Sequence, residues 1–363
     1  MLGLVERLGR QALFCLDPET AHGLSIKALK SGLPVAISSR YDLRLRATVA
    51  GITFDNPLGM AAGYDKNAEV PDALLRLGFG FAEVGTITPL PQAGNPKPRI
   101  FRLTEDGAVI NRLGFNNEGH AAAERRLAER AGRAGTVGVN IGANKDSADR
   151  IRDYGLGVER FAALASYLTV NISSPNTPGL RDMQSRASLA ELLARVVGAR
   201  DAAASKTGRK VPLFLKIAPD LQEADLEDIA AEVLEKAVEG VIVSNTTISR
   251  PTLKSSARIA ESGGLSGRPL FEHSTVALAK MRRLLGPDAA IIGVGGVDSA
   301  ETALEKIRAG ADLVQLYTGM IYAGPALPGR ILKGLSRFLD TEGLRSLAEI
   351  RDTRLVHWAD KPL

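Results

Sequence analysis

The stretch Val170-Asn-Ile-Ser-Ser-Pro-Asn-Thr-Pro-Gly-Leu180 changes abruptly from strand-forming residues to small polar ones. The segment before it, residues 161–169, is apolar and ends in residues that favour a strand. Proline restricts its own backbone and that of the preceding residue, so a regular strand cannot continue comfortably through Ser174-Pro175. A buried strand that opens into a neutral polar loop is typical of barrel enzymes. Taken alone, the stretch would equally suit an ordinary Asx or Ser/Thr turn.

Seven other short apolar runs resemble the strand in this stretch, and longer segments with helical spacing separate several of them. The eight candidate strands cover residues 57–62, 81–86, 137–141, 168–172, 213–217, 240–244, 290–294 and 313–317. Clear helical patterns cover residues 221–237 and 300–309. Eight strands that alternate with helices predict an α/β fold whose parallel sheet closes into a (β/α)8 TIM barrel.

Three regions follow from this pattern. Residues 39–340 should form the barrel, preceded by an N-terminal two-helix extension over residues 1–38. Residues 341–363 form a tail that is helical and then polar, and its role cannot be inferred from the sequence. Because a typical barrel needs about 250 residues, insertions must account for part of the remaining length.

The N-terminal extension carries two apolar stripes at helical spacing. The second stripe consists of His22, Ile26, Leu29 and Leu33, and Asp17-Pro18-Glu19 supplies the cap, proline and acid that start a helix. Such a hairpin could lie in a membrane interface or cover a hydrophobic tunnel. It could also pack on the barrel as a plain amphipathic pair.

Composition excludes several classes of protein. The chain has 363 residues, 45% of them hydrophobic, and a net charge of only +5, so a large core is expected and a nucleic-acid groove is not. The single cysteine, Cys15, excludes an internal disulfide, and the four histidines lack metal-ligand spacing, so no metal is expected. No signal peptide or spanning segment is recognisable. We therefore expect the protein in the cytosol or on the cytoplasmic face of the membrane.

Polar residues and glycines follow the carboxyl ends of the candidate strands. In a TIM barrel these ends converge on one face, which holds the active site. The group comprises Ala62-Gly-Tyr-Asp-Lys66, Thr86, Asn140, Asn171–Thr177, Lys216, Asn245-Thr246, Gly295-Gly296 and Tyr317-Thr318. Each has an ordinary structural explanation alone, but their joint placement predicts one site.

Two glycine-rich segments, residues 263–267 and 293–296, are predicted to be turns around the last strands, where barrels commonly hold a phosphate. Asp298 stands where a dinucleotide fingerprint has its third glycine, and a Walker A loop is absent. The ligand is therefore expected to be a mononucleotide-sized phosphate ester, although plain glycine turns would look the same.

Lys66 and Lys216 stand beside strand ends among small and apolar neighbours. A lysine at the pyrimidine edge of a flavin would stabilise its anionic reduced form, but surface lysines would fit the pattern too. Asp65 is the only acid in the first polar loop and is expected to be structural or to contact the cofactor. Neutral amides with a hydroxyl suggest a planar, imide-like substrate.

The residues from about 12 to 330 resemble class 2 dihydroorotate dehydrogenases, flavin enzymes of pyrimidine synthesis that pass electrons to quinone. Any one of the matching motifs is weak, but their order is specific. They are Leu16-Asp-Pro-Glu-Thr-Ala-His22, Ala61-Ala-Gly-Tyr-Asp-Lys66, Lys97-Pro-Arg-Ile-Phe-Arg102, Asn111-Arg-Leu-Gly-Phe-Asn-Asn117, Asn171-Ile-Ser-Ser-Pro-Asn-Thr177, Lys216-Ile-Ala-Pro-Asp220, Ser244-Asn-Thr-Thr247, Gly263-Gly-Leu-Ser-Gly-Arg-Pro269 and Gly293-Val-Gly-Gly296.

The resemblance implies oxidation of (S)-dihydroorotate to orotate. Ser174 would be the base that removes the C5 proton, and a water beside Thr177 and Phe115 would relay it. The related soluble classes carry cysteine at the position of Ser174. Substrate would be held by Lys66, Asn111, Arg112, Leu113, Gly114, Phe115, Asn171, Asn176, Asn245 and Thr246.

The resemblance also implies FMN as the cofactor. The phosphate would lie against Gly267, Gly296, Tyr317 and Thr318. The flavin ring and ribityl chain would contact Ala62, Gly63, Thr86, Asn140, Asn171, Lys216 and Ser244, and the cofactor positions also include Tyr64, Asp65 and Lys66.

Membrane quinone would reach the flavin between the N-terminal helices, past His22, Arg102 and Tyr317. This implies a peripheral protein on the cytoplasmic face of the cell membrane. Three rivals remain open at this point. They are the same reaction with an acceptor such as fumarate or NAD, a phosphate-binding barrel isomerase without flavin, and a protein that only binds ligand.

Overall fold

The protein is a closed barrel of eight parallel strands, as the sequence predicts. The computed structural model describes residues 9, 11–32, 42–255 and 258–363. Around the ring the strands run in sequence order, and the last pairs with the first. They are β3 (Leu58–Met60), β4 (Phe81–Ile87), β7 (Thr136–Ile141), β8 (Tyr167–Asn171), β9 (Leu213–Ile217), β10 (Gly240–Val243), β12 (Ala290–Val294) and β13 (Leu313–Leu316). Each overlaps one of the eight predicted runs.

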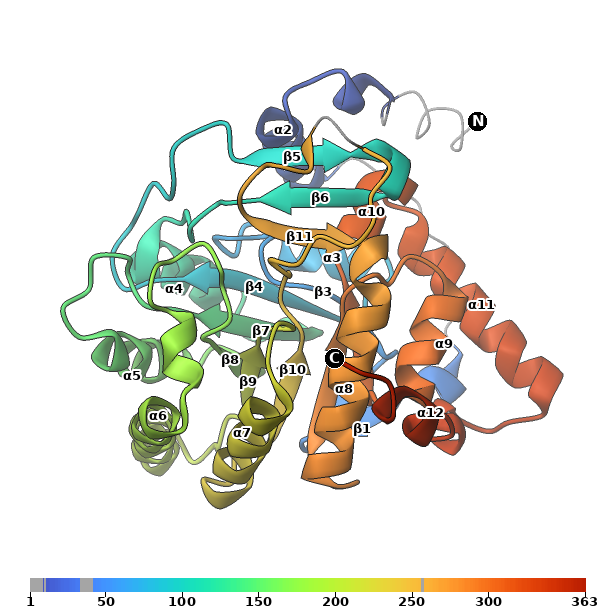
Figure 1. Cartoon of the computed structure of the whole chain (residues 1–363). Helices are drawn as coiled ribbons and strands as arrows, with labels where there is room; N and C mark the ends of the chain where they lie inside the picture. The colour runs from blue at the N-terminus through green and yellow to red at the C-terminus, as the bar shows by residue number, and fades with distance from the viewer. Residues whose placement is uncertain (1–8, 10, 33–41, 256–257) are drawn as a thin grey trace.

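Helices surround the ring (Figure 1). They are α3 (Pro71–Arg76), α4 (Gly119–Glu129), α5 (Arg150–Phe161), α6 (Arg186–Thr207), α7 (Glu223–Glu235), α8 (Phe271–Leu285), α9 (Ala300–Arg308) and α11 (Leu327–Glu342). The predicted helices at 221–237 and 300–309 are confirmed as α7 and α9. The short helix α10 (Thr318–Ala323) begins directly beyond β13.

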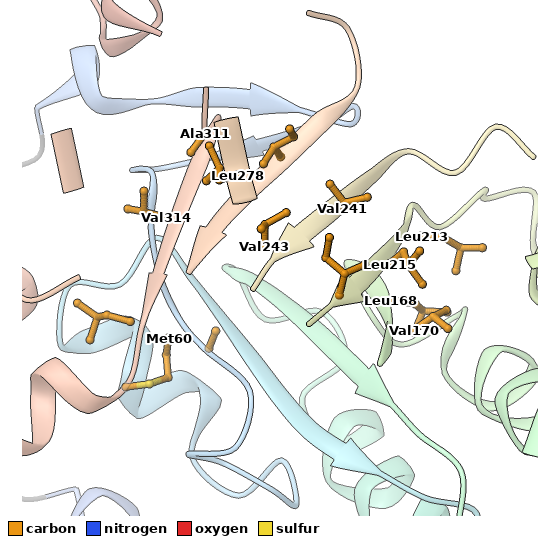
Figure 2. Packing of buried hydrophobic residues seen from close by; sticks show 14 of the residues in the cluster. Met60, Leu168, Val170, Leu213, Leu215, Val241, Val243, Leu278, Ala311 and Val314 are labelled. Carbon is orange, nitrogen blue, oxygen red and sulfur yellow. The ribbon is translucent and has the colours of Figure 1, made fainter. Parts of the chain in front are cut away.

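Side-chain alternation along the strands separates two apolar cores. Alternate residues such as Leu168 and Val170 of β8 belong to the large cluster between strands and helices, which Figure 2 shows in part. The residues between them point into the barrel, where Tyr167 packs with Phe81 and Phe214. Because successive strand residues face opposite sides, the same alternation turns Asn171 inward at the end of β8.

A small hairpin closes the amino-terminal end of the barrel. It consists of β1 (Ala47–Val49) and β2 (Ile52–Phe54), which pair in antiparallel fashion. Val49 and Phe54 join the inner apolar cluster, and the ring of Phe54 lies 5.1 Å from that of Phe81 between centroids. The barrel interior is therefore sealed by side chains at this end, and the functional site must lie at the other.

A three-stranded antiparallel sheet covers the carboxyl end, and the sequence prediction missed it. It consists of β5 (Ile100–Leu103), β6 (Ala108–Asn111) and β11 (Gly264–Gly267), seen above the barrel in Figure 1. The prediction of a turn over residues 263–267 was therefore wrong for most of that segment. Glycine is a poor strand former, but a Cβ on Gly264 would clash with the Thr246 side chain, so only glycine lets this strand approach.

The second helix of the N-terminal extension is confirmed as α2 (Pro18–Lys30). The Asp17 carboxylate accepts hydrogen bonds from the N–H groups of Glu19 and Thr20, as the start signal predicts. The Glu19 carboxylate pairs with Arg99, 2.7 Å apart, and ties α2 to the segment before β5. The first helix lies largely outside the described residues, of which 11–14 are helical, and Leu33 is also outside them.

The C-terminal tail packs on the barrel's outer helices. After α11 come a short 3-10 turn, Leu347–Ile350, and α12 (Leu355–Ala359), which contacts α8. The Trp358 ring packs edge-on against Phe271 at the start of α8, and its indole N–H donates to Glu305 of α9 at 2.7 Å. The tail therefore fastens two helices whose amino ends lie at the carboxyl face of the barrel.

We expect Trp358→Ala to lower the free energy of unfolding by about 3 to 5 kcal/mol, because it removes a large buried side chain and leaves Glu305 without this donor. Val356→Ala on the same helix is the matched control, since that valine is 70% exposed and its loss should change little. Urea unfolding of both variants measures the difference. Equal midpoints would show that the tail does not contribute to the fold.

Candidate active site

A cavity of about 780 Å³ opens at the carboxyl end of the barrel and extends beneath α2. Neutral amides and glycines line its barrel end, while apolar side chains such as Leu13, Ala21 and Leu29 line its N-terminal end. Most of the predicted site residues meet here. They are His22, Ala62, Gly63, Tyr64, Lys66, Thr86, Arg102, Asn111, Leu113, Gly114, Phe115, Asn171, Ser174, Asn176, Lys216, Ser244, Asn245, Thr246, Gly267, Gly296, Tyr317 and Thr318.

Four predicted residues do not line the cavity. The Asp65 carboxylate accepts hydrogen bonds from the N–H groups of Glu69 and Val70, which shapes the loop after β3. Arg112, just after β6, forms an ion pair with Glu261, 2.7 Å apart. Asn140 lies one layer behind the lining, and Thr177 is buried beside the Ser174 loop. Asp65 and Asn140 therefore shape the site through the neighbouring groups that they bind.

Asn140 and Asn171 belong to a buried hydrogen-bond network centred on Glu83. The Glu83 carboxylate accepts from the Asn140 amide at 2.8 Å, and also from Tyr167 and Gln315. Asn140 in turn accepts from the Thr86 hydroxyl at 2.6 Å and from Asn171 at 3.2 Å. Since the surrounding bonds determine which way each amide points, the network orients Asn171 toward the cavity.

Sequence reasoning missed Glu83, although a signal was present. An acid within the apolar run of residues 81–87 is unusual, because a buried carboxylate must be fully hydrogen-bonded. Glu83 on β4 is completely buried, and its partners Asn140, Tyr167 and Gln315 come from β7, β8 and β13. Its position on an inward-facing site of β4 shows that the network supports the floor of the cavity.

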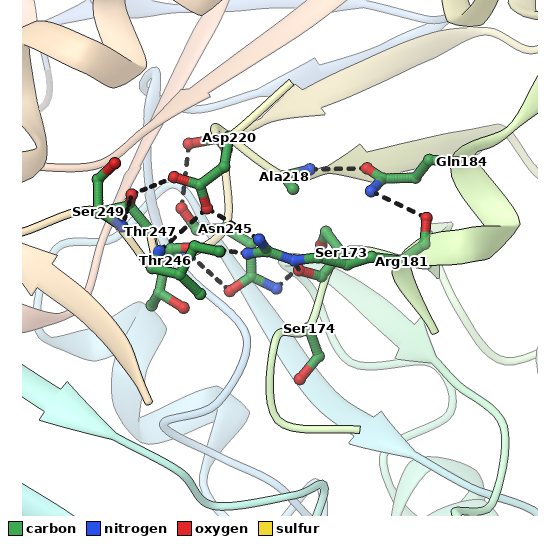
Figure 3. A network of polar contacts seen from close by, with 12 residues as sticks. Ser173, Ser174, Arg181, Gln184, Ala218, Asp220, Asn245, Thr246, Thr247 and Ser249 are labelled. Carbon is green, nitrogen blue, oxygen red and sulfur yellow. Dashed lines mark hydrogen bonds and ion pairs between the residues drawn. The ribbon is translucent and has the colours of Figure 1, made fainter. Parts of the chain in front are cut away.

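Ser174 lies at the cavity wall in the loop after β8, as predicted. Its hydroxyl oxygen accepts a hydrogen bond from the Asn176 backbone N–H at 3.2 Å, and its side chain is 95% buried. The Asn176 amide approaches Asn111 at 3.5 Å, and the Asn245 amide donates to Ser173 at 2.9 Å. The amides of Asn111, Asn171, Asn176 and Asn245 line the same cavity as Ser174, and Figure 3 shows part of this region.

Phe115 and Gly114 reach the cavity through an unusual backbone conformation. Both have positive φ, +53° for Phe115 and +71° for Gly114. This conformation is strained for phenylalanine and tends to occur where a loop must present a side chain at a functional site. A Cβ on Gly114 would lie 2.8 Å from the Asn95 side chain, so the loop depends on glycine there.

The two predicted lysines both enter the cavity. Lys216 is 95% buried, and burial lowers its pKa, opposed by the negative charge of Glu83. Within the part of the chain that the structure describes, its ammonium has no hydrogen-bond partner. Burial lowers the pKa of Lys66 to about 8. Neither lysine forms an ion pair within the described residues, so both suit an anionic or electron-rich ligand.

His22 on α2 packs with the rings of Tyr64 and Tyr317 next to Lys66. The Tyr317 hydroxyl lies 3.4 Å from His22 Nδ1, and Lys66 Nζ lies 3.4 Å from His22 Nε2. Burial and the charge of Lys66 lower the pKa of His22 to about 3, so its imidazole is neutral. Arg102 donates to the carbonyls of Leu13, Phe14 and Leu16, which fastens the chain before α2 over the cavity.

The other end of the cavity fits a phosphate-bearing planar group. Gly267 and Gly296 have positive φ and line the cavity, where backbone N–H groups without a side chain suit a phosphate. A Cβ on Gly296 would lie 2.4 Å from the Cβ of Phe271, so only glycine lets this turn pack against the start of α8. At the Ser174 end of the cavity, Thr246 carries a buried hydroxyl without a protein partner among the described residues, as expected where a ligand completes the site. The residues present are therefore compatible with a flavin nucleotide.

Among residues 9, 11–32, 42–255 and 258–363, no three His, Cys, Asp or Glu side chains are grouped so that they could hold a metal ion. The same residues include no helix with the length and apolar character needed to cross a membrane.

The closed barrel and the cavity at its carboxyl end define an enzyme of the (β/α)8 class. Residues 44–339 match the family model described as dihydroorotate dehydrogenase. The chain is 72% identical to the dihydroorotate dehydrogenase (quinone) of Mesorhizobium japonicum over the whole of both chains, and 66% identical to that of Sinorhizobium fredii over 99% of each. The chain therefore belongs to the dihydroorotate dehydrogenase family, in its quinone-dependent class 2.

A solved structure agrees with this assignment. The crystal structure of DHODH from Eimeria tenella in complex with ferulenol superposes with a TM-score of 0.88 at 41% identity, and covers 94% of this chain and 98% of its own. The resemblance stated from the motifs is thus confirmed. Enzymes of this family are flavin-dependent, in accord with the fit described above.

Proposed function

We propose that this enzyme oxidises (S)-dihydroorotate to orotate, with FMN as its cofactor and a membrane quinone as the final electron acceptor. The observation that carries the proposal is that one cavity joins Ser174 and four amides at the barrel mouth to an apolar passage under α2. The chemistry that bound FMN would supply is acceptance of a hydride from substrate C6 and transfer of the electrons to quinone. The residues of the chain supply binding, orientation and proton transfer.

The amides suit the substrate because dihydroorotate carries ring N–H and C=O groups and a single carboxylate. Asn111, Asn171, Asn176 and Asn245 can each donate and accept hydrogen bonds without adding charge. The Thr246 hydroxyl lacks a protein partner and is available to the ligand. Lys66 supplies the positive charge for the carboxylate, with Leu113, Gly114 and Phe115 closing the site from the loop after β6.

Ser174 is proposed as the base that takes the proton from substrate C5. A serine hydroxyl is a weak base, so it needs a partner that removes its own proton. Two features support such a relay. The Asn176 N–H bond stabilises negative charge on the Ser174 oxygen, and the Thr177 hydroxyl is buried without a protein partner in the described chain, so it can hold a water there.

The cofactor contacts follow from the cavity lining. Lys216, held inward at the end of β9, would stabilise negative charge on the reduced flavin ring. Thr86, Asn171 and Ser244 supply neutral hydrogen-bonding groups near the ring. Gly267 and Gly296, together with Thr318 at the start of α10, would hold the phosphate through N–H groups.

The acceptor end is proposed to lie under α2. The cavity there is apolar, and His22, Arg102 and Tyr317 mark its inner end. On the outside, Leu24 is 42% exposed one helical turn from the cationic Lys27, and Leu16, just before α2, is 40% exposed. Exposed leucines beside lysines favour peripheral binding to an anionic membrane surface, which we propose to be the cytoplasmic face of the cell membrane.

We expect Ser174→Ala to retain bound FMN but to slow flavin reduction by dihydroorotate by about 10²- to 10⁴-fold, since it removes the base without altering the cofactor site. Anaerobic stopped-flow spectroscopy measures the bleaching of the flavin directly. Ser185→Ala, on the exposed turn before α6, is the control and should reduce normally. Normal bleaching of Ser174→Ala would disprove the assignment of the base.

The binding of orotate should depend on pH through Lys66. Because the pKa of Lys66 is lowered to about 8, its amine is protonated and positively charged below that pH and neutral above it. Orotate affinity should be nearly constant at lower pH and then fall by up to about tenfold per pH unit. Titrations followed by the flavin spectrum test this, with Lys66→Arg as the control. Arginine stays charged, so an equal decline in that variant would exclude Lys66 as the cause.

Ala28→Trp should obstruct the acceptor passage, because Ala28 lines the outer end of the cavity on α2. Re-oxidation of the reduced flavin by a long-chain quinone should slow several-fold, while flavin reduction by dihydroorotate stays normal. Leu24→Trp on the same helix lies outside the cavity lining and serves as the control. Unimpaired quinone turnover in Ala28→Trp would show that quinone enters elsewhere.

A further inference from the structure

One arginine that does not line the cavity joins three loops of the active site. The Arg181 guanidinium donates from Nε to the Ser173 carbonyl at 3.1 Å and from Nη2 to the Thr246 carbonyl at 3.0 Å. Its Nη1 pairs with the Asp220 carboxylate at 2.9 Å. Figure 3 shows these contacts around the guanidinium. Ser173, Asp220 and Thr246 follow β8, β9 and β10, so the arginine connects three consecutive strand ends.

Asp220 also binds the loop after β10 directly. One of its carboxylate oxygens accepts from the Thr247 hydroxyl, and the other accepts from the Ile248 N–H at 3.0 Å. His273 Nε2 lies 3.8 Å from the carboxylate. The Arg181 and Asp220 side chains are only 20% and 12% exposed, so solvent screens their attraction less than that of a surface pair.

The geometry bears on Ser174 directly, because the Ser173 carbonyl belongs to the peptide bond that leads into it. The same guanidinium holds the carbonyl of Thr246, whose side chain lines the substrate end of the cavity. The Asn245 amide makes a second link, to the Ser173 hydroxyl. That link joins rotatable side chains, whereas the planar guanidinium binds two main-chain carbonyls in a rigid arrangement.

We propose that Arg181, held in place by Asp220, is a positioning residue that sets the distance between Ser174 and the Asn245-Thr246 loop. This inference rests on the proposed function, in which Ser174 removes the proton and that loop holds the substrate. Neither Arg181 nor Asp220 touches the reacting atoms. Their role is to keep the base and the substrate contacts in one geometry, since a displacement of about 1 Å can slow a reaction about 10²-fold.

Arg181→Lys is the decisive variant, because lysine keeps the charge next to Asp220 but cannot bridge two carbonyls as a planar fork. We expect the rate constant for flavin reduction by dihydroorotate to fall by about 10- to 100-fold, with weaker orotate binding. Re-oxidation by quinone uses the other end of the cavity and should stay normal, as should FMN content. Asp220→Asn should show the same pattern with a smaller loss.

Arg186→Lys is the matched control. Arg186 begins α6 five residues along the chain and pairs with Asp228 and Glu232, but it is 60% exposed and outside the cavity. Both half-reactions should be normal in this variant. Arg181→Ala provides a second measurement, in which added guanidinium ion should restore part of the rate of flavin reduction but not alter that of Ser174→Ala.

The outcomes separate the inference from the proposed function. Normal flavin reduction by Arg181→Lys would overturn the inference, as would an equal loss in both half-reactions accompanied by loss of FMN, which would indicate a general structural role. If Ser174→Ala is inactive in the same assay while Arg181→Lys is normal, only the positioning role fails. If Ser174→Ala reduces normally, the proposed base itself fails.

Discussion

The alternation of side chains on eight strands, hydrogen-bonded into a closed ring, is the constraint on which the rest of the structure depends. Each strand turns every second residue toward the helices, and these outward positions are almost uniformly apolar. The residues at the inward positions can therefore be polar without disturbing the apolar core between strands and helices. Near the carboxyl ends the inward positions change from aromatic and aliphatic residues to Asn140, Asn171 and Lys216. The same alternation that packs the barrel therefore also directs these polar side chains toward the site.

Glu83 shows what such an inward position requires. A carboxylate buried inside a barrel is tolerated only when its oxygens are hydrogen-bonded, because each unsatisfied buried group costs on the order of 1 to 3 kcal/mol. Its bonds to Asn140, Tyr167 and Gln315 come from strands on both sides of the ring. The network therefore links the register of these strands to the orientation of the Asn171 side chain. A shift in register would leave several buried polar groups unpaired at once.

Elements added to the barrel give the cavity its second end. A bare barrel would expose the amides of its carboxyl face to water, but the antiparallel sheet and α2 cover that face and enclose an apolar passage. The pairing of Glu19 with Arg99 and the three bonds from Arg102 fasten this cover through charged groups at its edges. The apolar face of α2 is thereby left for the cavity, so packing on the barrel and lining a passage are compatible roles of one helix.

The sequence by itself determined the eight strands, the helices between them and the start of α2 at Asp17, because these depend on residues a few positions apart. It also placed most of the site, since strand ends of a parallel barrel must converge. Only the tertiary structure decided that residues 264–267 pair with β6, that Asp65 and Arg112 do not line the cavity, and that Arg181 joins three loops. These features arise from contacts between segments that are distant in the chain. The lowered pKa values of Lys66 and His22 arise from burial. Neither long-range contacts nor burial in a cavity leaves a periodic pattern in the sequence.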